Sequence, residues 1–269
     1  MQGFLMNGAG NAFLLADTRP EGKDAFTPDR VRALAVRHGL DQVLLIDGTA
    51  DAPVMRVLNA DGGEVGACGN GARCVAWHLM REAGTEAVTL ASAGGPLVAE
   101  AAGDMRVRVD LGLARTGWLD IPLARAMETV SLPFDIDAGS HRLTAPGAVS
   151  MGNPHCVFFV EDADAIPARA IGHRMEHDPL FPERANIGFA QVIAPDRIRL
   201  RVWERGAGLT LACGTGAAAA VVAGHRKGLC ERAVTVVADG GELAVAWRAD
   251  GHVTVEGPVA LDGEIAIPA

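Results

Sequence analysis

The sequence predicts an α+β fold with two pseudo-symmetric lobes, each a curved sheet or barrel around a central helix. Three observations predict it. A Gly-rich turn with a cysteine occurs twice, a helix-compatible run of small residues follows each copy, and short apolar segments typical of strands outnumber helical ones. We expect lobes over residues 1–115 and 116–269, allowing for an exchange of terminal strands.

The two cysteine segments are near copies of each other. Ala67–Gly71 reads Ala-Cys-Gly-Asn-Gly, and Ala212–Gly216, 145 residues later, reads Ala-Cys-Gly-Thr-Gly. Farther along, with one residue inserted, Gly94-Gly95 corresponds to Gly240-Gly241. Because order and spacing both persist at a period far too long for a solenoid, the pattern indicates a duplicated domain rather than chance likeness between Gly/Ala-rich segments.

Local signals place the elements in order. Thr27 is a favourable N-cap and Pro28 suits a first helical position, so a helix is expected to start there. A second helix, Ala72–Ala83, should stop at Gly84, and its repeat, Ala217–Lys227, is rich in alanine, which suits burial on all sides. A further helix is expected near Ala165–Met175, and we interpret residues 112–146 as the crossover between lobes. The expected strands are Ala12–Ala16, Val43–Ile46, Val54–Leu58, Val88–Ala91, Leu97–Ala101, Met105–Leu111, Cys156–Val160, Phe189–Ile193, Ile198–Trp203, Val234–Ala238, Leu243–Arg248 and His252–Glu256.

Composition and charge narrow the class of protein. The 269 residues are 49% hydrophobic, enough for a large core, and carry a net charge of −9 with only 4% aromatics. The acidic balance, with no basic run, disfavours nucleic acid and anionic membrane surfaces as partners. No apolar stretch reaches the ~18 residues that a spanning helix needs. The N-terminus lacks a signal-peptide pattern, so we expect a cytoplasmic protein whose five cysteines are thiols.

Several cofactor classes lack their sequence signatures. The only lysines, Lys23 and Lys227, are not near a phosphate cup as a pyridoxal phosphate enzyme requires. Gly8-Ala9-Gly10 lacks the third glycine and the preceding strand of a dinucleotide site. The spacing of Cys68 and Cys74 is not that of a zinc site. The sequence therefore predicts neither a cofactor nor a metal.

The paired cysteines favour proton transfer. A cysteine in a Gly-rich turn that enters a helix meets backbone N–H groups, which should lower its pKa and could also bind a carboxylate. Taken alone, such a cysteine is more often a packing residue. The matched pair Cys68 and Cys213 instead suits chemistry on opposite faces of one carbon, with one thiolate as base and one thiol as acid. Cys74, Cys156 and Cys230 are expected to pack.

Further motifs lie in order along nearly the whole chain. They are Met6–Asn11, Asn59–Gly62, Cys68–Cys74, Met151–Cys156, Phe181–Phe189, Glu204–Gly208 and Ala212–Gly216. Together they resemble the diaminopimelate epimerase family. The resemblance implies a cofactor-independent isomerase that converts LL-diaminopimelate to the meso form, a step in lysine and peptidoglycan-precursor biosynthesis. It also implies two similar lobes, an active site in their cleft, closure on substrate and a homodimer.

The resemblance further assigns residues by motif position. Cys68 and Cys213 become the acid/base thiols and His155 lies beside the site. The implied substrate-binding residues are Asn11, Gln42, Asn59, Gly69, Asn70, Asn153, Asn186, Glu204, Arg205, Gly214 and Thr215. From the residues alone, Glu204 and Arg205 should point to opposite faces of a strand and form no mutual salt bridge, which leaves Arg205 able to grip a carboxylate. Without the motifs, the amides would be turn or cap residues and His155 a core histidine.

Three alternatives remain open at this point. A proline-racemase-like or hydroxyproline-epimerase-like enzyme shares the two-thiol logic but usually has His where this chain has Asn70. An isomerase of the phenazine-pathway type shares the fold and lacks the cysteine pair. A non-catalytic redox or metal-binding protein would use Cys68 and Cys213 differently, and stoichiometric zinc would favour it.

Overall fold

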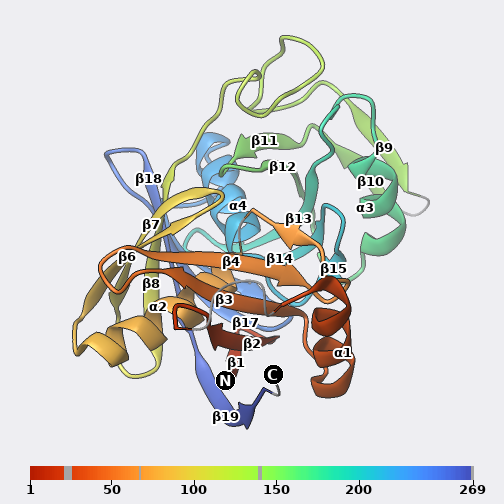
Figure 1. Ribbon diagram of the computed structural model, residues 1–269. Coiled ribbons are helices and arrows are strands. Elements are labelled where there is room, and N and C mark those ends of the chain that lie inside the picture. The colour runs from red at the N-terminus through yellow and green to blue at the C-terminus, as the bar shows by residue number, and fades with distance from the viewer. Residues whose placement is uncertain (21–25, 67, 139–140, 268–269) are drawn as a thin grey trace. The chain divides into compact units, whose positions relative to one another are not determined.

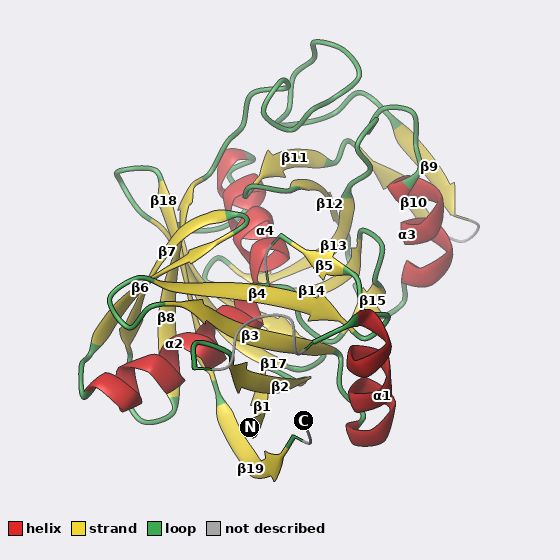
Figure 2. Ribbon diagram, viewed as in Figure 1, coloured by secondary structure: helices red, strands yellow, loops and turns green. Residues whose placement is uncertain are grey.

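The chain divides into two units, and the computed structural model describes residues 1–20, 26–66, 68–138 and 141–267. Unit 1 comprises Met1–Asp110 with Glu256–Ala269, and unit 2 comprises Leu111–Val255. Strands make up most of the regular structure of each unit (Figure 2), which confirms the predicted α+β class. No helix in the described ranges is long and apolar enough to cross a membrane.

The elements follow one scheme twice along the chain. Those that begin in unit 1 are β1 (Gln2–Gly8), β2 (Asn11–Asp17), α1 (Pro28–His38), β3 (Gln42–Gly48), β4 (Pro53–Asn59), β5 (Glu64–Val65), α2 (Gly69–Ala83), β6 (Ala87–Ser92), β7 (Gly95–Ala101), β8 (Arg106–Leu113) and, at the end of the chain, β19 (Ala260–Ala266). Those that begin in unit 2 are β9 (Asp135–Ala138), β10 (His141–Thr144), β11 (Gly147–Ser150), β12 (Pro154–Phe159), α3 (Ala168–Glu176), β13 (Asn186–Ala194), β14 (Arg197–Glu204), β15 (Gly208–Thr210), α4 (Gly214–Arg226), β16 (Ala233–Ala238), β17 (Gly241–Trp247) and β18 (His252–Pro258).

Strand pairing confirms the duplication. In unit 1, β2 pairs with β3 in parallel, β3 with β4 antiparallel, and β4 with both β5 (antiparallel) and β6 (parallel). In unit 2, β12, β13, β14, β15 and β16 repeat the same directions in the same order. The two Gly-Gly turns also match, because Gly95 and Gly241 close the β6–β7 and β16–β17 hairpins with φ values of 114° and 139°. Such φ values favour glycine.

The alanine-rich helix α4 is enclosed by its own unit. It packs against β11, β12, β13, β14, β16 and β17 (Figure 1), and residues 214–224 are all buried. The packing is close: a Cβ on Gly147 would lie 3.0 Å from Ala223 Cβ, and one on Gly224 would lie 2.8 Å from Cys230 Sγ. Small residues therefore let the strands approach this helix at native packing density, as the alanine content predicted.

Helix ends follow local chemistry. The Thr27 side chain accepts from Arg30 N at 3.3 Å, and α1 ends at Gly39 with φ 64°, while α2 ends at Gly84 with φ 65°. The start of α1 and the end of α2 agree with the prediction. Helix α3 starts at Ala168, later than expected, because the Asp162 side chain accepts from backbone N–H groups just downstream and stabilises a turn there.

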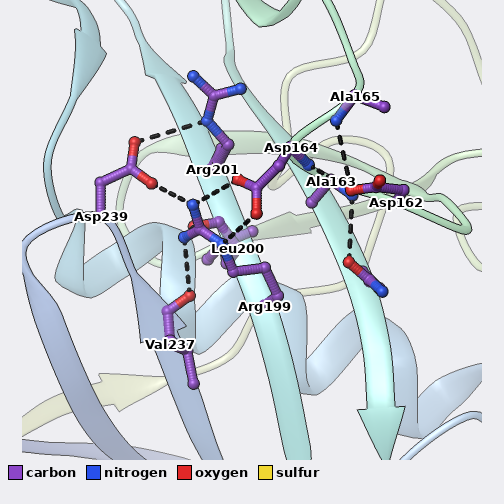
Figure 3. Close-up of polar contacts among 10 residues, drawn as sticks. Asp162, Ala163, Asp164, Ala165, Arg199, Leu200, Arg201, Val237 and Asp239 are labelled. Carbon is purple, nitrogen blue, oxygen red and sulfur yellow. Dashed lines mark hydrogen bonds and ion pairs between the residues drawn. The ribbon is translucent and has the colours of Figure 1, made fainter.

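An ion-pair cluster secures β14, the strand that leads to Glu204 (Figure 3). Arg199 on β14 bonds Asp164 Oδ1 at 2.6 Å, contacts Asp239, and donates to Val237 O at 3.2 Å. Arg201 Nε lies 3.5 Å from Asp239 Oδ2. These contacts join β14 to β16 and to the segment before α3, so they fix the strand that carries a predicted site residue.

The sequence analysis did not predict every strand, and two residues that it named fall outside the described ranges. The strands it did not predict are β1, β5, β9, β10, β11, β15 and β19, of which β9 and β10 lie in the segment left as a crossover. Lys23 and Ala67, named there, lie outside the described residues.

Candidate active site

Each of the two cysteines is the N-cap residue of a helix. Cys68 precedes α2 with φ −145° and ψ 105°, and Cys213 precedes α4 with φ −129° and ψ 111°. Their sulfurs accept from Gly71 N at 3.2 Å and Gly216 N at 3.3 Å, where a capping serine would place its oxygen. The two turns are therefore built alike, each inside its own unit.

Close packing explains the last glycine of each turn. A Cβ on Gly71 would lie 2.7 Å from Leu44 Cδ2, and one on Gly216 would lie 2.9 Å from Val202 Cγ2. The added carbon would also lie 3.3 Å from Cys68 Sγ or 3.2 Å from Cys213 Sγ. These glycines are thus required by the neighbouring strand and by the sulfur that their N–H groups hold.

In unit 1 the predicted binding residues form two amide pairs. Gln42 and Asn59 are cross-strand partners on β3 and β4, and Gln42 Nε2 donates to Asn59 Oδ1 at 2.8 Å. Asn70, in the first turn of α2, donates through Nδ2 to Asn11 Oδ1 at 2.6 Å. Asn70 is buried and Asn11 is half-buried. The structure thus brings these four predicted residues, with Gly69 beside Cys68, into hydrogen-bonded contacts.

In unit 2 a polar network runs from Arg205 to Cys213. Arg205 N donates to Asn186 Oδ1 at 2.9 Å, and Asn186 Nδ2 lies 3.4 Å from His155 Nε2. The network continues from His155 Nε2 to Asn153 Oδ1 at 3.0 Å, from Asn153 Nδ2 to Thr215 Oγ1 at 3.3 Å, and from Thr215 Oγ1 to Cys213 Sγ at 3.6 Å. The predicted binding residues of this half are connected to the cysteine.

His155 is a neutral member of that network. Burial, followed by the positive charge of Arg205, lowers the pKa of His155 to about 3. Because Asn153 Nδ2 is used toward Thr215, Asn153 Oδ1 faces the imidazole, and His155 Nε2 carries the hydrogen that this oxygen accepts. Asn186 Nδ2, near the same nitrogen, then donates to Pro154 O at 3.1 Å and only contacts the imidazole. His155 thus holds the Asn153 amide and carries no charge near neutral pH.

The expected lowering of both cysteine pKa values is wrong for Cys213. Burial raises the pKa of the Cys213 thiol well above its usual value, and the negative charge of Glu204 raises it further. Hydrogen bonds from Thr215 and Gly216 N oppose the shift but do not overcome it. Glu204 is itself held by Thr210, whose Oγ1 donates to Glu204 Oε1 at 2.6 Å. Cys213 is therefore a thiol in this structure.

Glu204→Gln should lower the pKa of Cys213. The neutral amide removes the charge that opposes thiolate formation, so thiolate should appear at lower pH than with Glu204. Ultraviolet thiolate absorbance against pH, in a Cys68→Ala background, measures the shift, and Glu161→Gln is the control because Glu161 is exposed in the same unit. An unchanged titration would mean that Glu204 does not contribute to the Cys213 pKa.

The other cysteines are packing residues, as predicted. Cys74, Cys156 and Cys230 are all buried and free. Burial raises the pKa of Cys74 to about 12 and that of Cys230 to about 11, and it raises that of Cys156 as well. None of these thiols is suited to act as a base near neutral pH.

Three residues that contact the predicted groups were missed from the sequence. Thr210 holds Glu204, while Asp41 and Arg73 contact Asn11 and Asn70. A usable signal existed for Arg73, since it is a charged residue within the stretch 71–76, whose other members are all small or apolar. Glu204 and Arg205 make their contacts separately, Arg205 Nη1 donating to Glu183 O at 2.9 Å.

Comparison with known proteins gives a consistent result. A family model described as "Diaminopimelate epimerase" matches residues 3–117 and 147–261. The chain is 52% identical over 268 residues to a protein of that name from Phenylobacterium zucineum (strain HLK1), covering 98% of this chain and 96% of the relative. It is 51% identical over 266 residues to another from Acidiphilium cryptum (strain JF-5), covering 97% and 94%.

The fold is similar to that of solved epimerase structures. One, from Pseudomonas aeruginosa and titled a predicted epimerase, has a TM-score of 0.72 at 17% identity and covers 100% of this chain and 99% of that one. A hydroxyproline epimerase from Agrobacterium vitis has a TM-score of 0.68 at 16% identity, covering 98% and 90%. At such identities the likeness supports the fold alone.

Proposed function

Because the chain belongs to the diaminopimelate epimerase family, we propose that it interconverts LL- and meso-diaminopimelate through proton transfer at Cα between two thiols and without a cofactor. The observation that supports this most directly is the matched pair of N-cap cysteines. In each, the sulfur accepts a hydrogen bond from the backbone N–H of the residue three positions later. A duplicated turn that offers one sulfur and several N–H donors per copy suits a carbon that must be deprotonated on one face and protonated on the other.

The two thiols take different roles at the start of a turnover. Cys213 is protonated in the described state, because burial and Glu204 oppose its thiolate. It therefore supplies the proton, and Cys68 acts as the base that removes the α-proton. After one turnover the protonation states are exchanged, and either proton exchange with solvent or the reverse reaction restores them.

The helix N-termini supply the carboxylate site. The first N–H groups of a helix point out of its N-terminus, and those of Gly69 in α2 and Gly214 in α4 come directly after the N-cap cysteines. As the α-proton leaves, negative charge develops on the carboxylate, and these fixed dipoles stabilise it without reorganising. Arg205 and the amide groups of each half then orient the ends of the substrate.

Turnover of LL-diaminopimelate in D2O tests this function. Because each thiol exchanges its hydrogen with water, the meso product should carry α-deuterium from its first appearance. Chiral chromatography with mass detection follows both isomers and their label. Early product that fully retains protium would argue for one shielded base and against the two-thiol mechanism.

The alternatives give different outcomes in the same assay. Conversion of proline or trans-4-hydroxy-L-proline, with no conversion of LL-diaminopimelate, would favour the racemase-like alternative. No conversion of any of these, with stoichiometric zinc by emission spectroscopy, would favour the metal-binding alternative. The proposal also includes action in the cytoplasm, as a homodimer, at the diaminopimelate step of lysine and peptidoglycan-precursor synthesis, which the family resemblance implies.

A further inference from the structure

Arg73 is a buried cation with no acidic partner among the residues that the structure describes. It lies on α2, five residues after Cys68, and is only 1% exposed. Burial lowers its pKa to about 10, so the guanidinium stays protonated near neutral pH. Among the described residues no carboxylate acts on its charge, and its Nε has no hydrogen-bond partner. An unpaired buried charge costs stability, which points to a role other than packing.

The guanidinium is the start of a directed hydrogen-bond relay. Arg73 Nη2 donates to Asn70 Oδ1 at 2.9 Å, and Asn70 Nδ2 donates to Asn11 Oδ1 at 2.6 Å. Asn11 Nδ2 lies 3.4 Å from Asp41 Oδ2, which also accepts from Ala12 N at 2.8 Å. All five residues belong to unit 1, and the relay runs from a buried end to an exposed one.

The two ends of the relay set its direction. A guanidinium can only donate and an ionised carboxylate can only accept, whereas each asparagine amide has one donating and one accepting end. Turning the Asn70 amide around would face its N–H groups toward Arg73. Turning the Asn11 amide around would face its oxygen toward Asp41. The charged ends therefore favour the same orientation of both amides, and each amide nitrogen uses one of its two hydrogens in the relay.

The backbone holds the exposed end of the relay in place. Asp41 N donates to Ala12 O at 2.9 Å, and Asp41 O accepts from Ala60 N at 3.1 Å. Asp41 thus has a fixed position between the start of β2 and the residue that follows β4, directly before Gln42. Its carboxylate reaches Asn11 and Ala12 from there.

The corresponding half-site of unit 2 has no such charged end. By the repeat, Arg73 corresponds to Ala218 and Asn70 to Thr215. There the Asn153 amide is oriented by the neutral pair of His155 and Thr215 instead. The cysteine turns of the two halves are alike, but the amides are oriented differently: by charged groups in unit 1 and by neutral groups in unit 2.

We propose that Arg73 and Asp41 are positioning residues that hold the Asn70 and Asn11 amides in one orientation, so that diaminopimelate always meets the same donor and acceptor edges on the Cys68 side. This rests on the proposed function, in which Asn11 and Asn70 contact the substrate. Neither Arg73 nor Asp41 needs to touch the substrate, and both act through the asparagines.

Steady-state kinetics of the full-length chain with LL-diaminopimelate test the relay. Asp41→Ala should raise KM about tenfold, the range for one lost hydrogen bond to a charged group, with kcat changed much less. Asp41→Asn should recover most of this loss, because its amide oxygen can still accept from Asn11 and Ala12. Asp51→Ala, an exposed carboxylate of the same unit, is the matched control and should leave KM unchanged.

Arg73→Met separates positioning from stability. Replacing an unpaired buried charge by an apolar side chain of similar length is often neutral or stabilising, so Tm should hold or rise while KM rises about tenfold. A double-mutant cycle adds the decisive comparison. In an Asn11→Ala background, Asp41→Ala should change KM less than twofold, because its effect passes through the missing amide.

The outcomes distinguish this proposal from the function on which it rests. A wild-type chain that does not turn over LL-diaminopimelate overturns the proposed function, and the positioning role with it. An active wild type with an unchanged KM in Asp41→Ala overturns the positioning role alone. So does an additive cycle, in which Asp41→Ala costs as much without Asn11 as with it. If Arg73→Met does not fold, Asp41→Ala and the cycle still decide.

Discussion

Alanine in place of either Cys68 or Cys213 should lower kcat/KM for LL-diaminopimelate by about 10³-fold or more. One positioned acid or base typically contributes 10²–10⁴-fold, and the proposed reaction needs both groups in every turnover. Each variant also removes the sulfur that caps its helix. That loss affects the free energy of unfolding, at about 1 kcal/mol, and does not by itself account for such a fall in rate.

Serine variants and a third cysteine serve as controls. Cys68→Ser and Cys213→Ser keep a hydroxyl that can accept from Gly71 N or Gly216 N, so the cap should survive while the acid/base function is lost. Cys230→Ala removes a buried thiol of unit 2 and should stay active. If one of the two alanine variants kept near-wild-type kinetics, a single residue would handle the proton and the two-thiol mechanism would be wrong.

Much of the site could be predicted because its signals are local. A Gly-rich turn, a small-residue run and a closing Gly84 are adjacent in the sequence, and they specify the N-cap and the end of α2 without reference to the rest of the fold. The same signals occur at α4, so the structural equivalence of Cys68 and Cys213 followed from the repeat. The longer strands of the repeat were predicted for the same reason, as the continuous apolar runs of β2 and β3 illustrate, whereas the short β5 and β15 were not.

What escaped prediction depends on distant partners. β1 pairs with β19, with Gln2 opposite Ala266. No local sequence pattern predicts a pairing between segments that are nearly the whole chain apart. The Cys213 pKa was misjudged because the helix N-terminus is visible in the sequence, whereas burial and the approach of Glu204 from β14 are not. Arg73 was missed for a similar reason. The motif around it is visible in the sequence, but its burial depends on the folded unit.

Mild oxidation should inactivate the protein almost completely by joining Cys68 to Cys213. The proposed mechanism requires the two sulfurs on opposite faces of one reacting carbon, and hence close together when the substrate is absent and the site is closed. With diamide as oxidant, two thiols lose two electrons and two protons to the reagent and form one disulfide. In the proposed mechanism Cys213 is the thiol and Cys68 the base, so we expect the Cys68 sulfur to be the one that attacks.

Peptide mapping and activity together check this expectation. Oxidised protein should contain a Cys68–Cys213 peptide, lose activity, and recover it with dithiothreitol, and substrate should protect by occupying the space between the sulfurs. Cys74, Cys156 and Cys230 should remain thiols, since burial raises the pKa of each. In Cys213→Ser no intramolecular bridge should form. A bridge from Cys68 to another cysteine in that variant would show that Cys68 faces a different sulfur, and the paired arrangement on which the mechanism depends would have to be abandoned.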